Sequence, residues 1–265
     1  MRLTVATWNV NGIRARGLQV RELIDREKPD IVCLQEIKAS PAQVPALLLE
    51  LPGYWNHWHG ERAYSGVSLH LSREVFPEEP AFCHPEFDYE NRIVLAETPR
   101  LTAGSVYVPN GGKDFPAKMR FLEAMERFAR ERATAGAAVL LAGDVNIART
   151  DQDVHPKERK PTVIGQLPEE RAVLERIVEA GLADVVRQLE PSNDQLFTWW
   201  APWRNMRQRN IGWRIDYILA GGPFARAATA CRVMADFGTS DHAPLVATFE
   251  LPEAAAPDSA EAPSP

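Results

Sequence analysis

The chain has 265 residues, of which 45% are apolar and 25% charged, and these values fit one large soluble α/β domain with a sizeable core. The longest run without a charged or strongly polar side chain, residues 135–143, is far too short to cross a bilayer. The N-terminus lacks the apolar stretch and cleavage site of a secretory signal. The three cysteines are odd in number and widely spaced, a pattern typical of reduced buried thiols rather than of disulfides or a zinc site. We therefore expect a soluble cytoplasmic protein that does not bind membranes.

The net charge of −6 argues mildly against a nucleic-acid partner, but its distribution removes that argument. Residues 251–265 contain three acidic and no basic side chains, so the rest of the chain is closer to neutral. Residues 199–214 contain four arginines and no acidic residue. Phosphates respond to charge within a Debye length of roughly 10 Å, so the net charge neither excludes nor requires such a partner.

Hydrophobic periodicity predicts strands interspersed with helices. The first strand, residues 3–10, is followed by a helix over 18–27 and a short strand at 31–34. The clearest helix covers 115–133, and another over 169–180 begins with an acidic turn after a proline. The other expected strands are 54–57, 66–71, 92–97, 102–108, 137–142, 214–219, 226–233 and 245–250, with a further strand-like run at 233–237.

This mixture predicts an α/β sandwich with two sheets in the middle and helices outside. We expect residues 1–250 to form this domain and residues 148–168 to form an extended surface loop. Residues 251–265 are mostly Pro, Ala, Ser and acids, which cannot bury a core, so we expect this tail to be disordered. The sequence contains no GxGxxG, GxxxxGK[ST], HExxH or CxxC motif, which weakens nucleotide-loop and zinc interpretations.

Two short acidic segments carry most of the functional information. Gly143-Asp144-Val145-Asn146 and Ser240-Asp241-His242 each follow an apolar, strand-like run. Asp144 and Asn146, two residues apart, project from the same side of an extended chain. Either segment alone is explained by an Asx turn. Together, and with partners elsewhere, they favour a hydrolase site built at strand ends.

Four further segments place polar side chains near predicted strand ends. Asn9 precedes an Asn-Gly turn, and Glu36 follows an almost entirely apolar strand, where an unpaired carboxylate would cost several kcal/mol. Tyr107 and Asn110 leave a strand beside two glycines, and Asp216 interrupts an apolar strand. A hard cation such as Mg²⁺ is one partner for a carboxylate like Glu36, since it is usually held by one or two carboxylates and substrate phosphate.

These residues together predict a phosphodiester hydrolase. Glu36 would hold Mg²⁺, with Mn²⁺ as a substitute, and Asn9 and Asp241 would lie near the ion. Asp216 would hydrogen-bond one ring nitrogen of His242, fix its tautomer and favour its protonated form.

The remaining groups would act on the phosphate and on the attacking water. Asp144 would orient or deprotonate the water, and the sequence leaves the identity of the base open. Asn146, Asn110, Tyr107 and His242 would donate to phosphate oxygens as charge develops.

An ordered series of motifs resembles the exonuclease III family of apurinic/apyrimidinic (AP) endonucleases, within the endonuclease/exonuclease/phosphatase, DNase I-like superfamily. The resemblance covers residues 1–250. The motifs are Trp8-Asn9-Val10-Asn11-Gly12-Ile13-Arg14, Leu34-Gln35-Glu36, Tyr64-Ser65-Gly66-Val67, Tyr107-Val108-Pro109-Asn110, Gly143-Asp144-Val145-Asn146-Ile147-Ala148, Gly212-Trp213-Arg214-Ile215-Asp216-Tyr217 and Ser240-Asp241-His242.

The resemblance implies a four-layered αββα sandwich of two mixed sheets packed face to face. It also implies Mg²⁺-dependent cleavage of duplex DNA 5′ to an abasic site, leaving a 3′-hydroxyl. Variable 3′–5′ exonuclease, 3′-phosphatase and 3′-phosphodiesterase activities would accompany this cleavage. The expected partner is double-stranded DNA with abasic or 3′-end damage, bound by a monomer.

The segment 199–214 suggests how DNA would be recognised, because it holds four of the seven tryptophans together with its arginines. A small satellite core explains one or two of the rings, whereas a DNA-facing surface explains rings and arginines together. By resemblance, Trp199 and Trp213 are walls of a pocket for a flipped abasic sugar, and Trp203 is a minor-groove wedge. Lys113 stands where some relatives have an arginine that reaches the DNA.

Three further side chains are candidate DNA-backbone contacts, each with an equally good interpretation as ordinary surface: Tyr64, Lys118 and Arg207. Two other functions remain open at this stage. One is a phosphatase or phospholipase of the same fold acting on inositol phosphates or lipid headgroups. The other is a DNA-binding relative without catalysis, which the intact set of acidic, amide and histidine residues makes less favourable.

Overall fold

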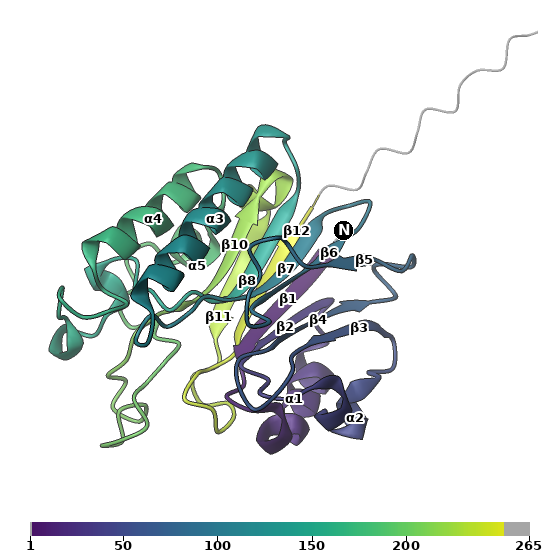
Figure 1. The fold of residues 1–265 in the computed structure, drawn as a ribbon, viewed down its shortest axis with the longest axis horizontal. Helices are drawn as coiled ribbons and strands as arrows, with labels where there is room; N and C mark the ends of the chain where they lie inside the picture. The colour runs from purple at the N-terminus through teal and green to yellow at the C-terminus, as the bar shows by residue number, and fades with distance from the viewer. Residues whose placement is uncertain (1, 252–265) are drawn as a thin grey trace, which may run out of the picture.

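The computed structural model describes residues 2–251, and the predicted tail lies outside them except for Leu251. Two six-stranded sheets lie face to face, with helices on their outer faces (Figure 1). The prediction of a four-layered αββα sandwich with two mixed sheets is confirmed. Among residues 2–251, no helix is both long and apolar enough to span a bilayer.

The first sheet has the strand order β11-β12-β1-β2-β4-β3. Its strands β1 and β2 are parallel, and its other neighbours are antiparallel. Helices α1 (Ile13–Glu27) and α2 (Ala46–Leu49) pack on its outer face. The strands are β1 (Arg2–Asn9), β2 (Ile31–Gln35), β3 (Tyr54–His59), β4 (Val67–Ser72), β11 (Ala228–Val233) and β12 (Leu245–Glu250).

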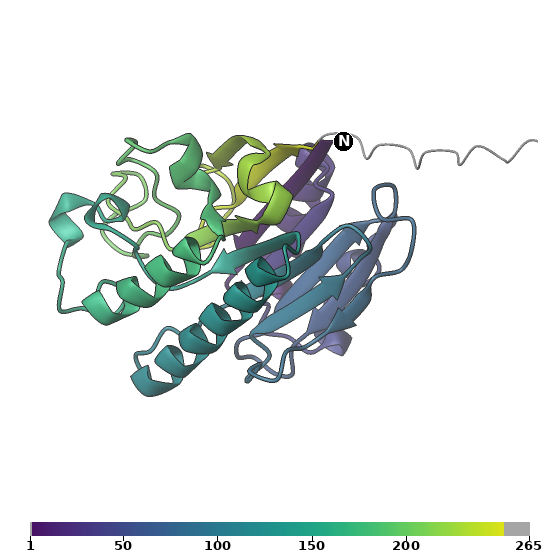
Figure 2. The same ribbon diagram turned by 90° about the horizontal axis from the view of Figure 1, so that it is seen from above.

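The second sheet has the order β5-β6-β7-β8-β10-β9, with β7 and β8 parallel. Its outer face is covered by α3 (Phe115–Thr134) and α4 (Pro168–Glu179), which lie side by side in both views (Figures 1 and 2). Helix α3 begins where Asp114 accepts a hydrogen bond from the Ala117 amide, as N-cap residues do. The strands are β5 (Ala81–Cys83), β6 (Ile93–Glu97), β7 (Thr102–Tyr107), β8 (Val139–Asp144), β9 (Ala183–Asp184) and β10 (Asp216–Gly221), and a short helix, α5 (Val185–Leu189), follows β9.

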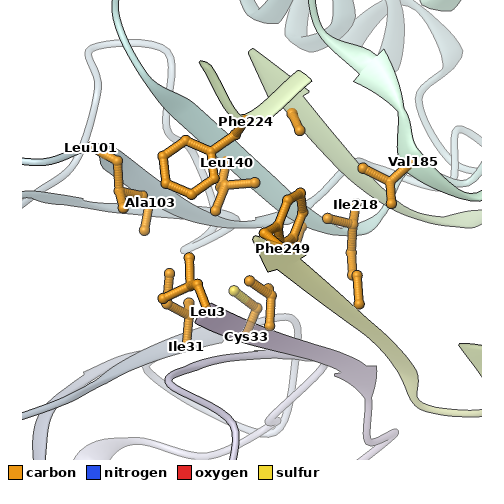
Figure 3. Packing of buried hydrophobic residues seen from close by; sticks show 14 of the residues in the cluster. Leu3, Ile31, Cys33, Leu101, Ala103, Leu140, Val185, Ile218, Phe224 and Phe249 are labelled. Carbon is orange, nitrogen blue, oxygen red and sulfur yellow. The ribbon is translucent and has the colours of Figure 1, made fainter. Parts of the chain in front are cut away.

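Apolar side chains fill the space between the sheets as one continuous cluster (Figure 3). Leu3, Cys33 and Phe249 come from the first sheet, and Leu140 and Ile218 come from the second. Separate clusters join each sheet to its outer helices. Burial of these faces supplies the main favourable free energy of folding, and it fixes the two sheets relative to each other.

Strand register brings polar residues to one end of the sandwich. In the second sheet, Asp144 at the end of β8 pairs with Tyr107 on β7 and with Asp216 on β10. In the first sheet, Asn9 at the end of β1 pairs with Gln35, the residue before Glu36. The predicted site residues therefore meet because adjacent strands end at the same level.

Some expectations about elements are wrong. Residues 234–237 form a turn after β11 rather than a strand, so Asp241 and His242 lie on a loop that leads into β12. The short elements α2, α5, β5 and β9, each of five residues or fewer, are not predicted. Residues 148–168 do form a long connection, which contains two 3₁₀ turns, Asp151–Asp153 and Pro156–Glu158.

Candidate active site

The turn after β2 holds Glu36 in an unusual backbone conformation. Its φ of 50° lies in the left-handed region, which residues other than glycine seldom adopt unless their surroundings impose it. The start of α1 holds this backbone conformation, because the amides of Gly12 and Ile13 donate to the carbonyls of Glu36 and Ile37 at 2.8 and 3.0 Å. The start of α1 therefore directs the Glu36 carboxylate.

Three donors converge on that carboxylate. Asn9 Nδ2 and the Tyr107 hydroxyl donate to Glu36 Oε1 at 3.0 and 2.9 Å, and Lys38 Nζ lies 2.7 Å from Oε2. Asn9 Nδ2 also donates to Asp144 Oδ2 at 2.9 Å. Asn9 thus joins a carboxylate of the first sheet to one of the second.

Asp144 and Asn146 form a compact turn at the end of β8. The Asn146 amide donates to Asp144 Oδ1 at 2.9 Å, and Asn146 Nδ2 donates to Asp144 Oδ2 at 3.2 Å and to the Val108 carbonyl at 2.9 Å. Asn110 Nδ2 donates to Asn146 Oδ1 at 3.4 Å. The Asx turn that the sequence allows is therefore present, and it serves to fix both side chains at the site.

His242 is held between two carboxylates. Its Nδ1 lies 2.9 Å from Asp216 Oδ2, and its Nε2 lies 3.8 Å from Asp144 Oδ2. The His242 carbonyl accepts a hydrogen bond from Trp8 Nε1 at 3.1 Å. Asp216 Oδ2 faces the ring as the sequence predicts, so the Nδ1 position is a donor and Nε2 faces the site.

Burial and charge shift the pKa values of these groups in different directions. Burial raises the pKa of Asp144 to about 7, against the lowering effect of the His242 charge. Burial disfavours the charged form of His242, but Asp216 and Asp144 outweigh it and raise its pKa to about 10. For Glu36, burial is outweighed by hydrogen bonds from Asn9 and Lys38, which lower its pKa. An imidazolium and an ionised Glu36 therefore lie on either side of Asp144.

Burial and the nearby Glu36 and Asp144 carboxylates raise the pKa of Tyr107. Its hydroxyl is therefore neutral and a hydrogen-bond donor. The pKa of Asp241 is lowered, because His242 and hydrogen bonds from Asn11 and Trp199 outweigh its burial. Asp241 is therefore ionised beside the pocket.

The donor set suits a hard divalent cation. One ligand atom from each of Glu36, Asp144 and His242 lies within 4.8 Å of the others. His242 is the poorest ligand of the three, because its raised pKa keeps Nε2 protonated. The carboxylate oxygens available at the site are then those of Glu36 and Asp144, together with those of Asp241, which accept from Asn11 Nδ2 and Trp199 Nε1 at 2.9 and 3.1 Å.

A pocket of about 370 Å³ opens above these groups. Trp199 and Trp213 form part of its wall, with ring centroids 5.6 Å apart and planes at 75°. Isolated bridges connect Trp199 to Trp213 and to His242, so this wall is tied to the catalytic loop. The other lining residues are Glu36, Tyr107, Asn110, Asn146, Ile164, Ile215, Asp241 and His242.

Other predicted DNA contacts lie on the surface. Trp203 is 59% exposed and Tyr64 is 50% exposed. The exposed Lys113 has its ammonium 5.3 Å from the Tyr64 ring centroid, and Arg92 Nη2 donates to the Tyr64 hydroxyl at 3.1 Å. These side chains are accessible to a ligand larger than the pocket.

Three basic residues have different roles from those expected. Lys118 is fully buried and ion-paired with Glu170, so its predicted DNA-backbone contact is wrong. Arg214 is also fully buried, with hydrogen bonds to Asp153 and Asp184. It therefore anchors the 199–214 segment and contributes no exposed charge to it.

Arg207 binds the backbone of the loop before His242. Its Nε, Nη1 and Nη2 atoms donate to the carbonyls of Ala235, Ser240 and Phe237. This arrangement favours a role in shaping the loop before His242 over the predicted phosphate contact. Arg204 and Arg209 are the exposed arginines of the segment.

Sequence reasoning did not assign roles to Asn11, Lys38 and Arg92. Asn11 belongs to the Asn-Gly turn after β1, and that turn was a usable signal. Lys38 comes two residues after Glu36, and a local turn brings its ammonium to the Glu36 carboxylate. The alternation of side chains along a strand does not predict this contact. Arg92 lies over the Tyr107 ring at 4.7 Å, and no local pattern marks it.

Buried carboxylates, a histidine held by a carboxylate and a pocket at the strand ends define a metal-dependent phosphoester hydrolase. The model of the Endonuclease/Exonuclease/phosphatase family matches residues 6–242. The chain belongs to this family, and it is a hydrolase of the nuclease type.

The chain is similar over most of its length to two named relatives. It is 30% identical over 248 residues to an exodeoxyribonuclease of Bacillus subtilis, covering 92% of this chain and 98% of the relative. It is 31% identical over 257 residues to Recombination repair protein 1 of Drosophila melanogaster, covering 94% of this chain but only 37% of that longer protein.

Two solved structures share the fold over most of the chain. A 3′ phosphatase from Neisseria, bound to a product DNA hairpin, superposes with a TM-score of 0.84 at 31% identity and covers 94% of this chain and 99% of its own. An AP endonuclease from Archaeoglobus fulgidus has a TM-score of 0.84 at 28% identity and covers 94% and 100%. The names of these proteins agree with a nuclease that acts in DNA repair.

Proposed function

We propose that the chain is a Mg²⁺-dependent DNA-repair phosphodiesterase that cleaves duplex DNA 5′ to abasic sites and leaves a 3′-hydroxyl. It also removes nucleotides and blocking groups from 3′ ends, and it acts as a monomer. The observation that carries the proposal is the pocket, which joins a phosphate-cleaving set on one side to two tryptophan rings on the other.

The shape of the pocket supports selection of an abasic nucleotide. Trp199, Trp213, Ile164 and Ile215 form the apolar part of the pocket wall beside His242. We expect the two crossed rings to favour a deoxyribose without a base over an intact nucleotide, whose base would need additional room between them. Extrusion of an abasic site also costs less, because no base stacking is lost.

Different residues have different proposed roles at the phosphate. The His242 imidazolium, held by Asp216, and the neutral Tyr107 hydroxyl donate to phosphate oxygens on which charge develops. Asn146 and Asn110 add amide donors from the neighbouring turn. When bound, Mg²⁺ supplies electrostatic stabilisation of the phosphate and of the leaving oxygen, and Glu36 and Asp241 would hold it with Asn9 close by.

Asp144 is the group proposed to direct and deprotonate the attacking water. Its pKa of about 7 matches a general base that works near neutral pH. Its Oδ1 is fixed by the Asn146 amide, and Asn9 Nδ2 donates to its Oδ2. The positive charge of His242 opposes the rise in the pKa of Asp144 and so favours the ionised form that can accept a proton.

The test is incision of a duplex that contains one tetrahydrofuran abasic analogue, with Mg²⁺ and then with Mn²⁺. We expect a product with a 3′-hydroxyl from the native chain and none above background from Asp144→Asn. Parallel assays on 3′-recessed duplex, 3′-phosphate duplex and a soluble inositol phosphate separate the activities. Failure to incise the abasic duplex, or preferential hydrolysis of the inositol phosphate, would overturn the proposal; light scattering reports whether the active species is a monomer.

A further inference from the structure

Three of the six histidines gather where the edge strands of the two sheets approach each other. His57 and His59 are two residues apart on β3, so they project from the same face of that edge strand. His84 follows β5, the edge strand of the second sheet, and Asp88 lies in the next turn. None of these four residues lines the active-site pocket.

The ligand atoms of this cluster point toward one another. One atom from each of His59, His84 and Asp88 lies within 4.8 Å of the other two. His57 Nε2 lies 3.3 Å from His84 Nε2, and His59 Nε2 lies 2.6 Å from Asp88 Oδ2.

Contacts outside the cluster orient its ligand atoms. His84 Nδ1 lies 3.2 Å from the Ile93 carbonyl, so Nδ1–H donates there and leaves the Nε2 lone pair facing the cluster. Asp88 Oδ1 accepts from the amides of Arg92 and Ile93 at 2.8 and 3.0 Å, which directs Oδ2 toward His59. Backbone carbonyl partners of this kind are what fix the tautomer of metal-binding histidines.

Partial burial also suits a bound ion. The side chains of His59 and Asp88 are 19% and 11% exposed. The rings of His59 and His84 stack with centroids 3.7 Å apart, so one ring has to turn for both to bind the same ion. His57 stacks on Phe82 of β5 at 4.8 Å. The cluster is thus backed by the protein on one side, while the exposed His84 leaves an entry route from solvent.

We propose that His59, His84 and Asp88 form a second metal site, separate from the active site and with His57 beside His84, that takes one transition-metal ion of the imidazole-preferring class, with Zn²⁺ as the leading candidate. Two imidazoles and one carboxylate are a ligand set for Zn²⁺, whereas Mg²⁺ prefers oxygen ligands only. On binding, the ion replaces the proton that His59 and Asp88 share. The site would clamp β3 to the segment after β5.

The clamp lies next to the active-site periphery. Asp88 holds the backbone of Arg92, whose guanidinium lies over Tyr107 and bonds Tyr64. His59 lies at the end of β3, from which the chain continues to Tyr64. An ion in the cluster would therefore order the two segments that present Tyr64 and Arg92.

The experiment measures Zn²⁺ binding to the full chain after chelator treatment, with millimolar Mg²⁺ present to occupy the oxygen-rich active site. We expect one Zn²⁺ per chain by elemental analysis and the visible absorption of tetrahedral Co²⁺ when Co²⁺ is used instead. His84→Gln should lower affinity at least 10-fold, the scale of losing a ligand or its support. Because His84 is exposed, this variant should fold, and circular dichroism checks it; His59→Gln provides a second test.

Two controls separate this site from others. His155→Gln removes a histidine elsewhere on the surface and should leave the Zn²⁺ stoichiometry unchanged. Glu36→Gln impairs the active-site ligand set and should also leave it unchanged. The proposal is overturned if the native chain binds no Zn²⁺, if His84→Gln and His59→Gln bind it as the native chain does, or if Glu36→Gln abolishes it.

Discussion

His242 is the residue on which the chemistry of the site depends most. Its ring contacts Asp216 at Nδ1 and approaches Asp144 at Nε2, and both carboxylates favour the imidazolium. A protonated Nε2 donates to an anion and does not bind a cation. Of the three clustered residues Glu36, Asp144 and His242, the proposed function therefore assigns Glu36 to the metal, Asp144 to the attacking water and His242 to the phosphate.

The substitution Asp216→Asn tests whether a protonated His242 stabilises the phosphate. The amide removes the negative charge that stabilises the imidazolium, so phosphate stabilisation by His242 weakens. We expect the single-turnover incision rate to fall on the order of 100-fold to 1,000-fold, the usual loss when one transition-state donor is removed. Binding of uncleaved abasic duplex should change little, measured by fluorescence anisotropy. A fall in binding as large as the fall in rate would contradict this role.

Trp213 and Trp203 lie in different environments, so their removal should affect incision and duplex binding differently. Trp213 lines the pocket, whereas Trp203 is 59% exposed outside it. Trp213→Ala should reduce abasic incision about 10-fold to 100-fold through loss of sugar positioning, with a smaller effect on general duplex binding. Trp203→Ala should show the reverse balance. Equal losses of incision and binding for Trp213→Ala would mean that the ring is only structural.

At the scale of elements, the close contact between β7 and β8 sets the position of Asp144. Gly143 pairs with Val106, and Asp144 pairs with Tyr107 in the same parallel ladder. A Cβ atom on Gly143 would lie 1.8 Å from the Val106 carbonyl oxygen. Glycine is thus required one residue before the proposed base, because the neighbouring backbone occupies the side-chain position.

Gly143→Ala should therefore destabilise the protein by about 3 kcal/mol or more, since the clash is with backbone and cannot be relieved by a rotamer change. The matched control is Gly136→Ala, where φ is also positive but nothing lies within 4 Å of the added Cβ; it should cost about 1 kcal/mol from backbone strain alone. Urea unfolding measures both. Similar losses for the two variants would show that the strand contact is unimportant.

The regular elements were the part of the fold that the sequence could predict. The central strands and the helices α1, α3 and α4 were predictable because their buried faces impose regular spacing on apolar residues. Their ends also marked Asn9, Glu36, Asp144 and Asp216 as neighbours. Local pattern could not show that residues 234–237 form a turn, because apolar residues in a loop over the core resemble those of a short strand.

The sequence could not predict which basic side chains are buried, because burial depends on partners that are distant in sequence. Arg214 and Lys118 are buried because acidic partners distant in sequence, Asp153, Asp184 and Glu170, reach them in the folded chain. Only tertiary structure decides whether an arginine among tryptophans faces DNA or an internal carboxylate. Resemblance to a family located the tryptophan wall, but it did not distinguish these two environments.

At the scale of the whole molecule, the site exists only when the two sheets are packed together. Asn9, Glu36 and His242 belong to the first sheet or its loops, and Tyr107, Asp144 and Asp216 belong to the second. The Asn9–Asp144 hydrogen bond crosses between them, as does a buried bond from Gln35 Nε2 to Ser105 Oγ at 3.1 Å. Activity and tertiary packing should therefore be lost together.

Stability of that packing should depend on pH through His70, a buried residue of β4. Burial lowers its pKa to about 3. Its two ring nitrogens are occupied by Ser68 Oγ and Asn56 Oδ1, both at 2.9 Å. Because Oδ1 only accepts, Nδ1 carries the proton and Nε2 accepts from the Ser68 hydroxyl, so the neutral ring satisfies both contacts.

Proton binding by the folded and unfolded chains decides in which direction stability changes with pH. Below the ordinary histidine pKa of about 6.5, the unfolded chain binds a proton at this residue while the folded chain does not until about pH 3. Folding stability should therefore fall as pH decreases from 6.5 toward 3, by up to about 1.4 kcal/mol per pH unit from this one residue. Urea unfolding of the chelator-treated chain at pH 7, 6 and 5 measures the slope.

His70→Asn should lower stability at pH 7 by loss of packing and of hydrogen bonds, but it should flatten the pH dependence between 6.5 and 5. The difference in slope isolates His70 from every other titrating group, including the carboxylates of the candidate site, since those are common to both proteins. His155→Gln, which removes a partly exposed histidine, should change the slope much less. If His70→Asn keeps the native slope, the buried neutral imidazole is not what makes the sandwich sensitive to acid.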